Sequence, residues 1–176
     1  MPVMQPEVPA ERWGLGSEGR AAARELARAL PPAPYVVTSD EPKAQQTAQE
    51  LVGARGGTLT VDARVAETRR PHVWNADFAE LARQFVAGRR HEGWESQDSV
   101  VARFDAAVRE AIEGSHGAPV VIVDHGQAMT LWLRSVRAVD DGPRFWSELA
   151  FPDAWSVGLE WSQGALLAEG APARVP

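Results

Sequence analysis

The sequence has no cysteine, a single lysine and no long apolar run. The absence of cysteine excludes disulfides, thiolate metal sites and a cysteine nucleophile. The longest unbroken apolar stretch, residues 118–123, is far too short to cross a bilayer. The first residues contain Pro2, Pro6 and Pro9 and no basic leader, which is not the pattern of a signal peptide. Together these absences favour a cytoplasmic protein with no membrane partner.

The charge balance is acidic, with a formal net charge of -6 and an isoelectric point near 5.2. A chain of this sign is not expected to bind nucleic acid. Its 176 residues, 44% hydrophobic and 24% charged, are enough for one domain with a proper core and too few for two large ones. Because no repeat or linker divides the chain, we predict a single domain over residues 1–176.

Hydrophobic periodicity predicts helices and strands in alternation. After a loop over residues 1–16, the predicted helices cover residues 17–30 with Ser17 as N-cap, a segment from Pro42 to the break at Gly56, a segment capped by Asn75, a segment after Ser96, and residues 129–136. The predicted strands cover residues 35–38, 59–65, 119–123, 155–161 and 165–168, with a turn at Gln163 and Gly164 and with Trp155 and Trp161 on an apolar face. The alternation indicates an α/β sandwich with a mostly parallel sheet.

Residues 14–19 read Gly-Leu-Gly-Ser-Glu-Gly, which has the G-x-G-x-x-G form of a dinucleotide-binding fingerprint. That fingerprint requires a strand that feeds directly into the glycine turn. Three prolines precede the glycines here, and they make a central strand unfavourable. We therefore interpret these glycines as a loop before a helix and expect no nucleotide cofactor.

In an open α/β sheet, ligands bind at the carboxyl ends of the strands. The polar residues that follow three of the predicted strands are Ser39, Asp40 and Lys43, then Glu67, Arg69 and Arg70, and then Asp124 and His125 before Gly126. A histidine, a glutamate and cations beside helix N-termini form a plausible anion site.

Each of these residues also has an ordinary structural explanation. A histidine that ends a buried strand is more often a hydrogen-bonded structural residue than a catalyst. Glu67, Lys43 and the two arginines could each be solvated. The four histidines have no short-spaced ligand pair, so no metal site is expected. No G-x-S-x-G elbow is present, which argues against a serine hydrolase.

The order of several segments resembles the histidine phosphatase (phosphoglycerate mutase-like) superfamily. Residues 13–20 are similar to its W-x-L-[ST]-x-x-G loop, and residues 39–48 are similar to its S-[SP]-x-x-R-A-x-Q-T-A segment. Residues 65–67 are similar to its L-x-E, residues 93–96 with Arg103 to its G-E-S followed by arginine, and residues 121–126 to its V-x-x-S-H-G. Residues 151–154 are similar to the family's closing segment. The resemblance runs from Trp13 to Trp161 and implies a three-layer α/β/α sandwich with a mostly parallel sheet.

The family's chemistry implies phosphoryl transfer through a phosphohistidine, with no metal and no cofactor. A neutral histidine attacks phosphorus, cations and a second histidine hold the phosphoryl oxygens, and a carboxylic acid protonates the leaving oxygen. By this resemblance His125 is the second histidine, Glu67 is the acid, and Lys43 stands where the family has its second arginine. The implied phosphate site comprises Lys43, His125, Arg69, Arg70 and Gly126, and the implied partner is a small phosphorylated substrate.

The chain departs from the family pattern in two ways. Lys43 keeps the charge of arginine but lacks its planar bidentate fork, and Arg69 or Arg70 could compensate. The family begins with a strand that ends in R-H-G or R-H-A and carries the nucleophilic histidine, and no such tripeptide occurs here. The resemblance therefore implies that the first strand is missing or truncated. We hypothesise that a misplaced start codon put Met1 just after Arg-His-Ala, in preference to a true loss.

The sequence leaves two classes of function open. The first is a phosphomonoester hydrolase that is catalytically incomplete as written. The second is a catalytically dead family member that binds a phosphorylated ligand or a protein partner around His125 and Lys43. Mutase activity is less expected, because this length leaves little room for the extra substrate loops of mutases. A missing strand would leave a sheet edge that could pair between copies, so a homodimer is an open expectation.

Overall fold

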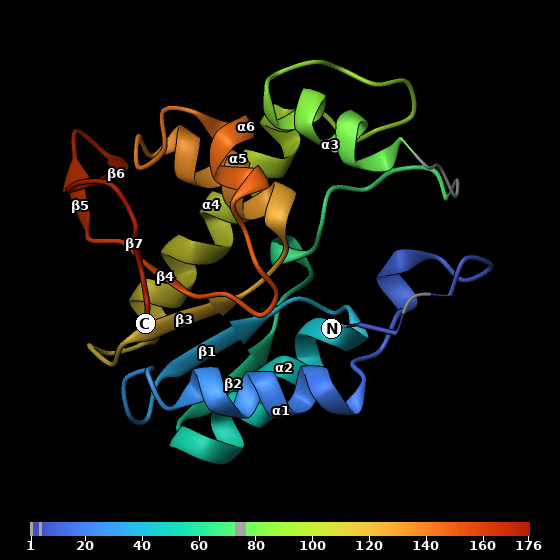
Figure 1. Ribbon diagram of the computed structural model, residues 1–176. Helices are drawn as coiled ribbons and strands as arrows, with labels where there is room; N and C mark the ends of the chain where they lie inside the picture. Colours follow the sequence, from blue (N-terminus) through green and yellow to red (C-terminus); the bar gives the residue numbers. More distant parts are fainter. Residues whose placement is uncertain (1, 4, 73–76) are drawn as a thin grey trace.

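A short parallel sheet lies at the centre of the molecule, as the computed structural model in Figure 1 shows. The structure describes residues 2, 3, 5–72 and 77–176. The strands are β1 (Tyr35–Thr38), β2 (Thr58–Val61) and β3 (Val120–Val123), and their order in the sheet is β2-β1-β3. Both pairs are parallel, with Val37 level with Thr60 on one side and Ile122 on the other. The carboxyl ends of all three strands therefore lie along one edge.

Helices cover both faces of this sheet, so the fold has three layers (Figure 1). One face carries α1 (Ser17–Ala27) and α2 (Pro42–Arg55), and the other carries α4 (Gln97–Gly114) and α5 (Gly126–Ser135). Side chains of a strand alternate between the faces. Val121 accordingly packs with Leu51 on the α1–α2 side, whereas Val37 and Ile122 join the cluster on the α4–α5 side. The predicted α/β sandwich with a parallel sheet is confirmed.

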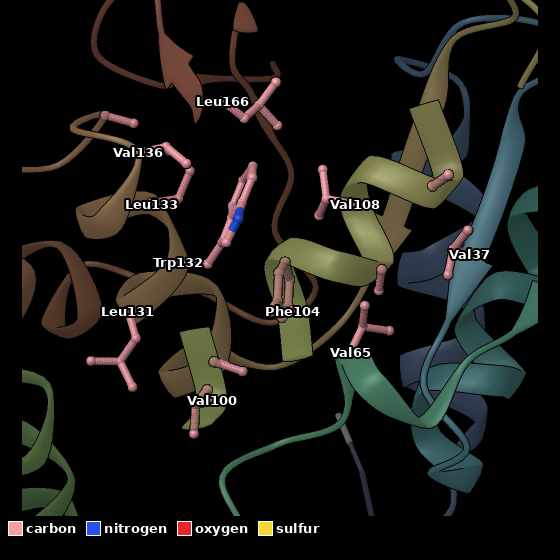
Figure 2. Close-up of a cluster of buried hydrophobic side chains, with 14 of the residues drawn as sticks. Val37, Val65, Val100, Phe104, Val108, Leu131, Trp132, Leu133, Val136 and Leu166 are labelled. Atoms are coloured by element: carbon pink, nitrogen blue, oxygen red, sulfur yellow. The ribbon is translucent and has the colours of Figure 1, made fainter. Parts of the chain in front are cut away.

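The larger hydrophobic cluster lies between the sheet and the α4–α5 layer (Figure 2). Phe104 of α4 and Trp132 of α5 meet with their ring centres 5.5 Å apart. The Trp132 indole N–H also donates a hydrogen bond of 3.3 Å to the Asp105 carboxylate, which keeps this polar atom satisfied. Burying side chains of this size stabilises the fold by roughly 1.5–3 kcal/mol each. The cluster thereby holds α5 in place, and the N-terminus of α5 carries the site.

Smaller elements complete the chain. They are η1 (Ala10–Arg12), η2 (Ala63–Val65), α3 (Phe78–Val86), α6 (Gly142–Ser147), β4 (Trp155–Ser156), β5 (Leu159–Ser162), β6 (Ala165–Ala168) and β7 (Ala173–Arg174). β5 and β6 form an antiparallel hairpin whose turn, Gln163 and Gly164, has positive φ at both residues, as the sequence predicts. β4 pairs with β7. Within the described part of the chain, no helix has the length and apolar character needed to cross a membrane.

Two helix boundaries differ from the sequence prediction. Gly16, not Ser17, is the N-cap of α1, and the helix ends at Ala27 rather than at Leu30, where the chain tightens into turns before Pro31. The predicted Asn75 cap lies outside the described residues.

The helix predicted from residue 129 begins earlier. α5 starts at Gly126, directly after His125, because the Glu67 carboxylate caps its first turn from another part of the chain. The short α6 was not predicted, since six residues are too few for a periodic pattern.

Two predicted strands are also corrected. The strand predicted over residues 59–65 ends at Val61, and the chain then turns into η2 because the Asp62 side chain accepts a hydrogen bond of 2.8 Å from the Arg64 N–H. The single strand predicted over residues 155–161 is two strands, β4 and β5, with different partners. Trp161 is 53% exposed and lies 4.7 Å from the Arg109 guanidinium instead of on a buried face.

Candidate active site

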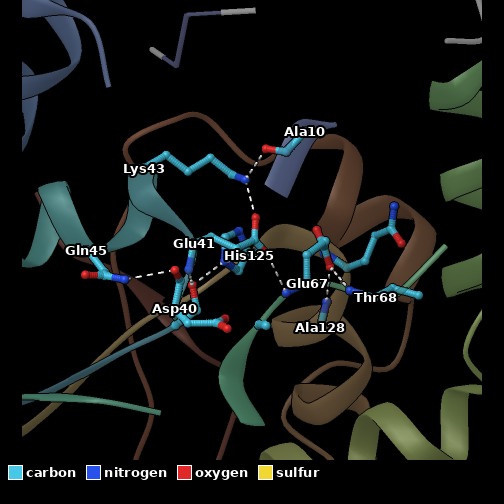
Figure 3. A network of polar contacts seen from close by, with 12 residues as sticks. Ala10, Asp40, Glu41, Lys43, Gln45, Glu67, Thr68, His125 and Ala128 are labelled. Carbon is cyan, nitrogen blue, oxygen red and sulfur yellow. Dashed lines mark hydrogen bonds and ion pairs between the residues drawn. The ribbon is translucent and has the colours of Figure 1, made fainter. Parts of the chain in front are cut away.

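The polar residues that follow the three parallel strands converge at the carboxyl edge of the sheet (Figure 3). Ser39 follows β1, Glu67 follows the short η2 turn after β2, and His125 follows β3. They meet because parallel strands end at the same edge. Glu67 and His125, with Glu41 and Lys43, line the polar end of a cavity of about 1240 Å³, and Ser39 is buried behind them. The polar residues that follow the strands therefore lie close together in the fold.

His125 is the N-cap residue of α5 and its ring is almost fully buried. Its Nε2 lies 2.7 Å from the Ser39 Oγ and 3.3 Å from a carboxylate oxygen of Glu41. Burial lowers the pKa of the imidazole, and the negative charges of Glu41 and Glu67 oppose that shift. The ring is therefore held with one nitrogen aimed at the centre of the polar cluster.

Glu67 caps the N-terminus of α5. Its carboxylate accepts hydrogen bonds from the N–H groups of Gln127 at 3.3 Å and Ala128 at 3.1 Å, and from its neighbour Thr68 at 2.9 Å. The N-terminus of a helix attracts negative charge, since its first N–H groups have no partner within the helix. The site thus places a carboxylate beside the buried histidine.

Lys43 lies in the first turn of α2, and its ammonium points into the same cluster. It pairs with the Glu41 carboxylate and donates a hydrogen bond of 2.9 Å to the Ala10 carbonyl. Glu41 is itself 6% exposed and receives the Glu67 N–H at 3.0 Å. Burial raises the pKa of the Glu41 carboxyl, but the charges of His125 and Lys43 and the hydrogen bonds from Lys43 and the Glu67 N–H outweigh it, so the pKa lies below its ordinary value. Glu41 was not identified from the sequence, and the signal that could have found it is its position two residues before the lone lysine.

The remaining predicted phosphate ligands lie at the wall of the cavity. Arg69 is exposed, whereas the Arg70 guanidinium lies 4.5 Å from the centre of the Phe78 ring and donates to the Thr68 carbonyl at 3.3 Å. Both line the cavity, as does Gly126. A side chain at Gly126 would meet the indole nitrogen of Trp146 at 3.2 Å, so the backbone there approaches its neighbours closely.

Among known protein families, the histidine phosphatase superfamily (branch 1) matches residues 10–167 of this chain. The chain belongs to the histidine phosphatase superfamily. The resemblance drawn from the motifs is therefore confirmed. No curated protein matches the chain.

Solved structures share the fold. A mycobacterial glucosyl-3-phosphoglycerate phosphatase with inorganic phosphate has a TM-score of 0.73 and 23% identity, over 98% of this chain and 93% of that one. The structure of mycobacterial hydrolase 1 has a TM-score of 0.68 and 22% identity, over 94% of this chain and 90% of that one. Bacillus stearothermophilus YhfR has a TM-score of 0.68 and 20% identity, over 94% and 86%. At these identities the likeness shows the fold.

Arg103, the arginine that follows the G-E-S-like segment, fixes the backbone around Glu67. Its guanidinium donates to the carbonyls of Arg64 at 2.6 Å, Ala66 at 2.7 Å and Glu67 at 3.0 Å. The same group forms a buried ion pair with Glu95. A planar guanidinium has enough donors to hold a turn of this kind at several points.

Asp124 stands where the family motif has a serine. Burial, with a smaller contribution from Glu67, raises the pKa of its carboxyl well above the ordinary range. Asp124 lines the cavity, and no residue in the described part of the chain donates a hydrogen bond to its side chain. The described residues also contain no group of three or more histidine, aspartate or glutamate side chains that could hold a metal ion.

The same cavity continues along the outer edge of β3. The carbonyls of Pro119 and Val123 accept from the N–H groups of Tyr35 and Ser39, so the odd-numbered residues of this segment face β1. Backbone groups of a strand alternate in direction, and those of Val120 and Ile122 therefore face the cavity. A volume of 1240 Å³ is larger than an ordinary small-molecule pocket.

Proposed function

We propose that the protein is a phosphomonoester hydrolase that works through a phosphohistidine. The observation that carries the proposal is the convergence of His125 Nε2, the Lys43 ammonium and the N-terminus of α5 at one end of the cavity. Cations and the N-terminus of a helix bind a phosphoryl group well. Membership of the histidine phosphatase superfamily supports the reaction class. The substrate is a small phosphorylated molecule.

In this proposal, His125 and Lys43 hold the phosphoryl oxygens with the backbone at Gly126, and Arg69 and Arg70 contact the substrate at the cavity wall. A histidine nitrogen attacks phosphorus, the P–O ester bond breaks, and the leaving oxygen takes a proton from Glu67. Water then attacks phosphorus and the P–N bond breaks. Glu67 accepts a proton from that water, and inorganic phosphate leaves.

The attacking histidine is not His125 but a second one. All four histidines of the sequence are in the described part of the chain, and among them His125 alone lines the cavity. The open edge of β3 supports a nucleophile carried on an additional strand. A strand parallel to β3 would end beside His125, because parallel strands share their carboxyl edge. Pro2 lines the same cavity, so a segment attached before residue 1 would be within reach.

The alternative is a binding module that uses the same end of the cavity without turnover. Two observations favour it. Among the described residues, His125 is the single histidine at the site, so no second histidine is present there to act as the nucleophile. Lys43 is also already paired with Glu41. The module's ligand would be a phosphorylated molecule or a protein partner.

Hydrolysis of p-nitrophenyl phosphate separates the two functions. The comparison is between the 176-residue chain and a form extended at its amino terminus by a strand ending in Arg-His. We expect turnover in the extended form only, and a loss of roughly 100-fold or more when His125→Ala removes a phosphate-binding group from it. His72→Ala, an exposed histidine, is the matched control and should keep full activity. Absence of turnover in both forms would support the binding module.

A further inference from the structure

The Glu41 carboxylate occupies the point at which the anion-binding groups of the site converge (Figure 3). Its Oε2 pairs with Lys43, its Oε1 accepts the Glu67 N–H at 3.0 Å, and the same oxygen lies 3.3 Å from His125 Nε2. These partners come from α2, from the segment after η2 and from the N-terminus of α5. One buried carboxylate therefore joins three separate elements.

A phosphate oxygen and a carboxylate oxygen accept the same hydrogen bonds and attract the same cations. Lys43 and His125 are also the groups that hold the phosphoryl oxygens under the proposed function, on which this inference rests. Two anions cannot share these partners at hydrogen-bond distance without strong repulsion. We propose that Glu41 is an internal competitor for the phosphoryl group, which a bound phosphomonoester displaces.

Lys43 suits this exchange. An ammonium is a compact charge with three donors on a flexible stem, so it can keep the Ala10 carbonyl and change its anionic partner. Glu41 itself lines the cavity, which gives its side chain space to move aside. Lys43, which replaces the family's arginine, thus acts together with the buried Glu41 two residues before it.

Displacement selects the ligand by its charge. Glu41 is tethered at the N-cap of α2, so its effective concentration at the site far exceeds that of a free anion. A carboxylate or a phosphodiester brings one negative charge, as Glu41 does, and gains nothing by competing. A phosphomonoester carries close to two charges at pH 7 and three terminal oxygens. The competitor therefore makes the site selective for monoesters over diesters and carboxylates.

Binding measurements on the 176-residue chain test this without any turnover. The probes are sodium acetate and inorganic phosphate, and their binding is measured by calorimetric titration and by the change in the Tm of the protein. Acetate should bind Glu41→Ala and raise its Tm with concentration, because it refills the vacated position, and it should leave the wild type unchanged. Glu41→Gln keeps the shape but not the charge, and it should bind phosphate about tenfold or more tightly than the wild type.

Glu50→Gln is the matched control, because Glu50 lies on the same helix and pairs with Arg20 and Arg24 away from the site. It should bind phosphate as the wild type does. Equal phosphate affinity in the wild type and Glu41→Gln would overturn the inference, and this comparison decides the matter even where Glu41→Ala does not fold. A wild type that responds to acetate as Glu41→Ala does would also overturn it. If the extended chain shows no hydrolysis but acetate still binds Glu41→Ala, the proposed hydrolase function is rejected and the proposed competition by Glu41 is retained.

Discussion

At the scale of single residues, the polar end of the cavity holds more acid than base. Glu41, Glu67 and Asp124 face one lysine and one buried histidine. Glu41 and Glu67 are satisfied by an ion pair and by N–H groups. Asp124 has no such donor among the described residues, and burial, followed by the negative charge of Glu67, raises the pKa of its carboxyl. An unpartnered carboxyl in a cavity costs stability whenever it has to ionise.

Asp124→Asn should therefore stabilise the protein at neutral pH. A carboxyl whose pKa is raised by folding holds a proton that the unfolded chain releases above pH 3.8, so stability falls as pH rises from there. The expected gain in the free energy of unfolding is roughly 1–2 kcal/mol at pH 7 and close to zero below the unfolded pKa. Urea titrations at both pH values measure it.

The control for this prediction is Asp40→Asn, an exposed aspartate at the end of β1. It should change stability by less than about 0.5 kcal/mol at either pH. A loss of stability at pH 7 in Asp124→Asn would contradict the interpretation that the half-buried Asp124 carboxylate is costly.

At the scale of elements, the N-terminus of α5 and the segment after η2 support each other. Glu67 from that segment caps α5, and Arg103 from α4 ties the backbone of the segment by its carbonyls. Glu95 in turn neutralises Arg103, with both side chains largely buried. The position of the proposed acid is thus set by contacts across α4, α5 and the loop, and not by its own turn.

Replacing Arg103 by methionine should destabilise the protein by about 3 kcal/mol, because it leaves Glu95 buried without its partner and frees three backbone carbonyls. Thermal or urea unfolding measures the change. Arg144→Met removes an ion pair on α6 whose arginine is 75% exposed, and it should cost less than about 0.5 kcal/mol. Equal losses of unfolding free energy in the two variants would show that the Arg103 contacts stabilise the fold no more than an exposed ion pair does.

At the scale of the whole molecule, no strand among the described residues pairs with the outer edge of β3, which lies beside the large cavity. Protein interiors are otherwise close-packed, with few voids larger than a water molecule. An exposed strand edge is also a template for pairing with another chain. The single domain, the homodimer and the cytoplasmic location all stay predictions from the sequence.

Amide hydrogen exchange should reveal this edge in the 176-residue chain. Val120 and Ile122, which face the cavity, are expected to exchange about tenfold or more faster than Val121 and Val123, which face β1. Equal protection of both sets in dilute monomer would mean that the edge is covered. Protection that grows with protein concentration would support a homodimer through β3.

Much of this site could be predicted from residue order. His125, Glu67 and Lys43 each follow a predicted strand, and the parallel topology brings strand ends together whatever the loops do. Glu41 could not be predicted, because nothing local indicates that its side chain turns inward to Lys43 and His125.

Two further features depended on distant partners. Arg70 lies over Phe78, a ring from another element, instead of reaching the centre of the cluster. The segment over residues 155–161 alternates like one strand, yet it divides because β7 pairs with its first part and β6 with its second. Neither partner can be read from the segment itself.

The alternation of helices and strands, the family and the identity of the residues at the strand ends can be read from the residue order alone. These follow from local periodicity and from motifs in a set order, which need no knowledge of packing. The tertiary structure decided which anion the positive groups hold, which backbone supports Glu67, and which edge of the sheet is open. Those outcomes depend on side chains and strands that are distant in the chain, and only the packed fold determines which of them come into contact.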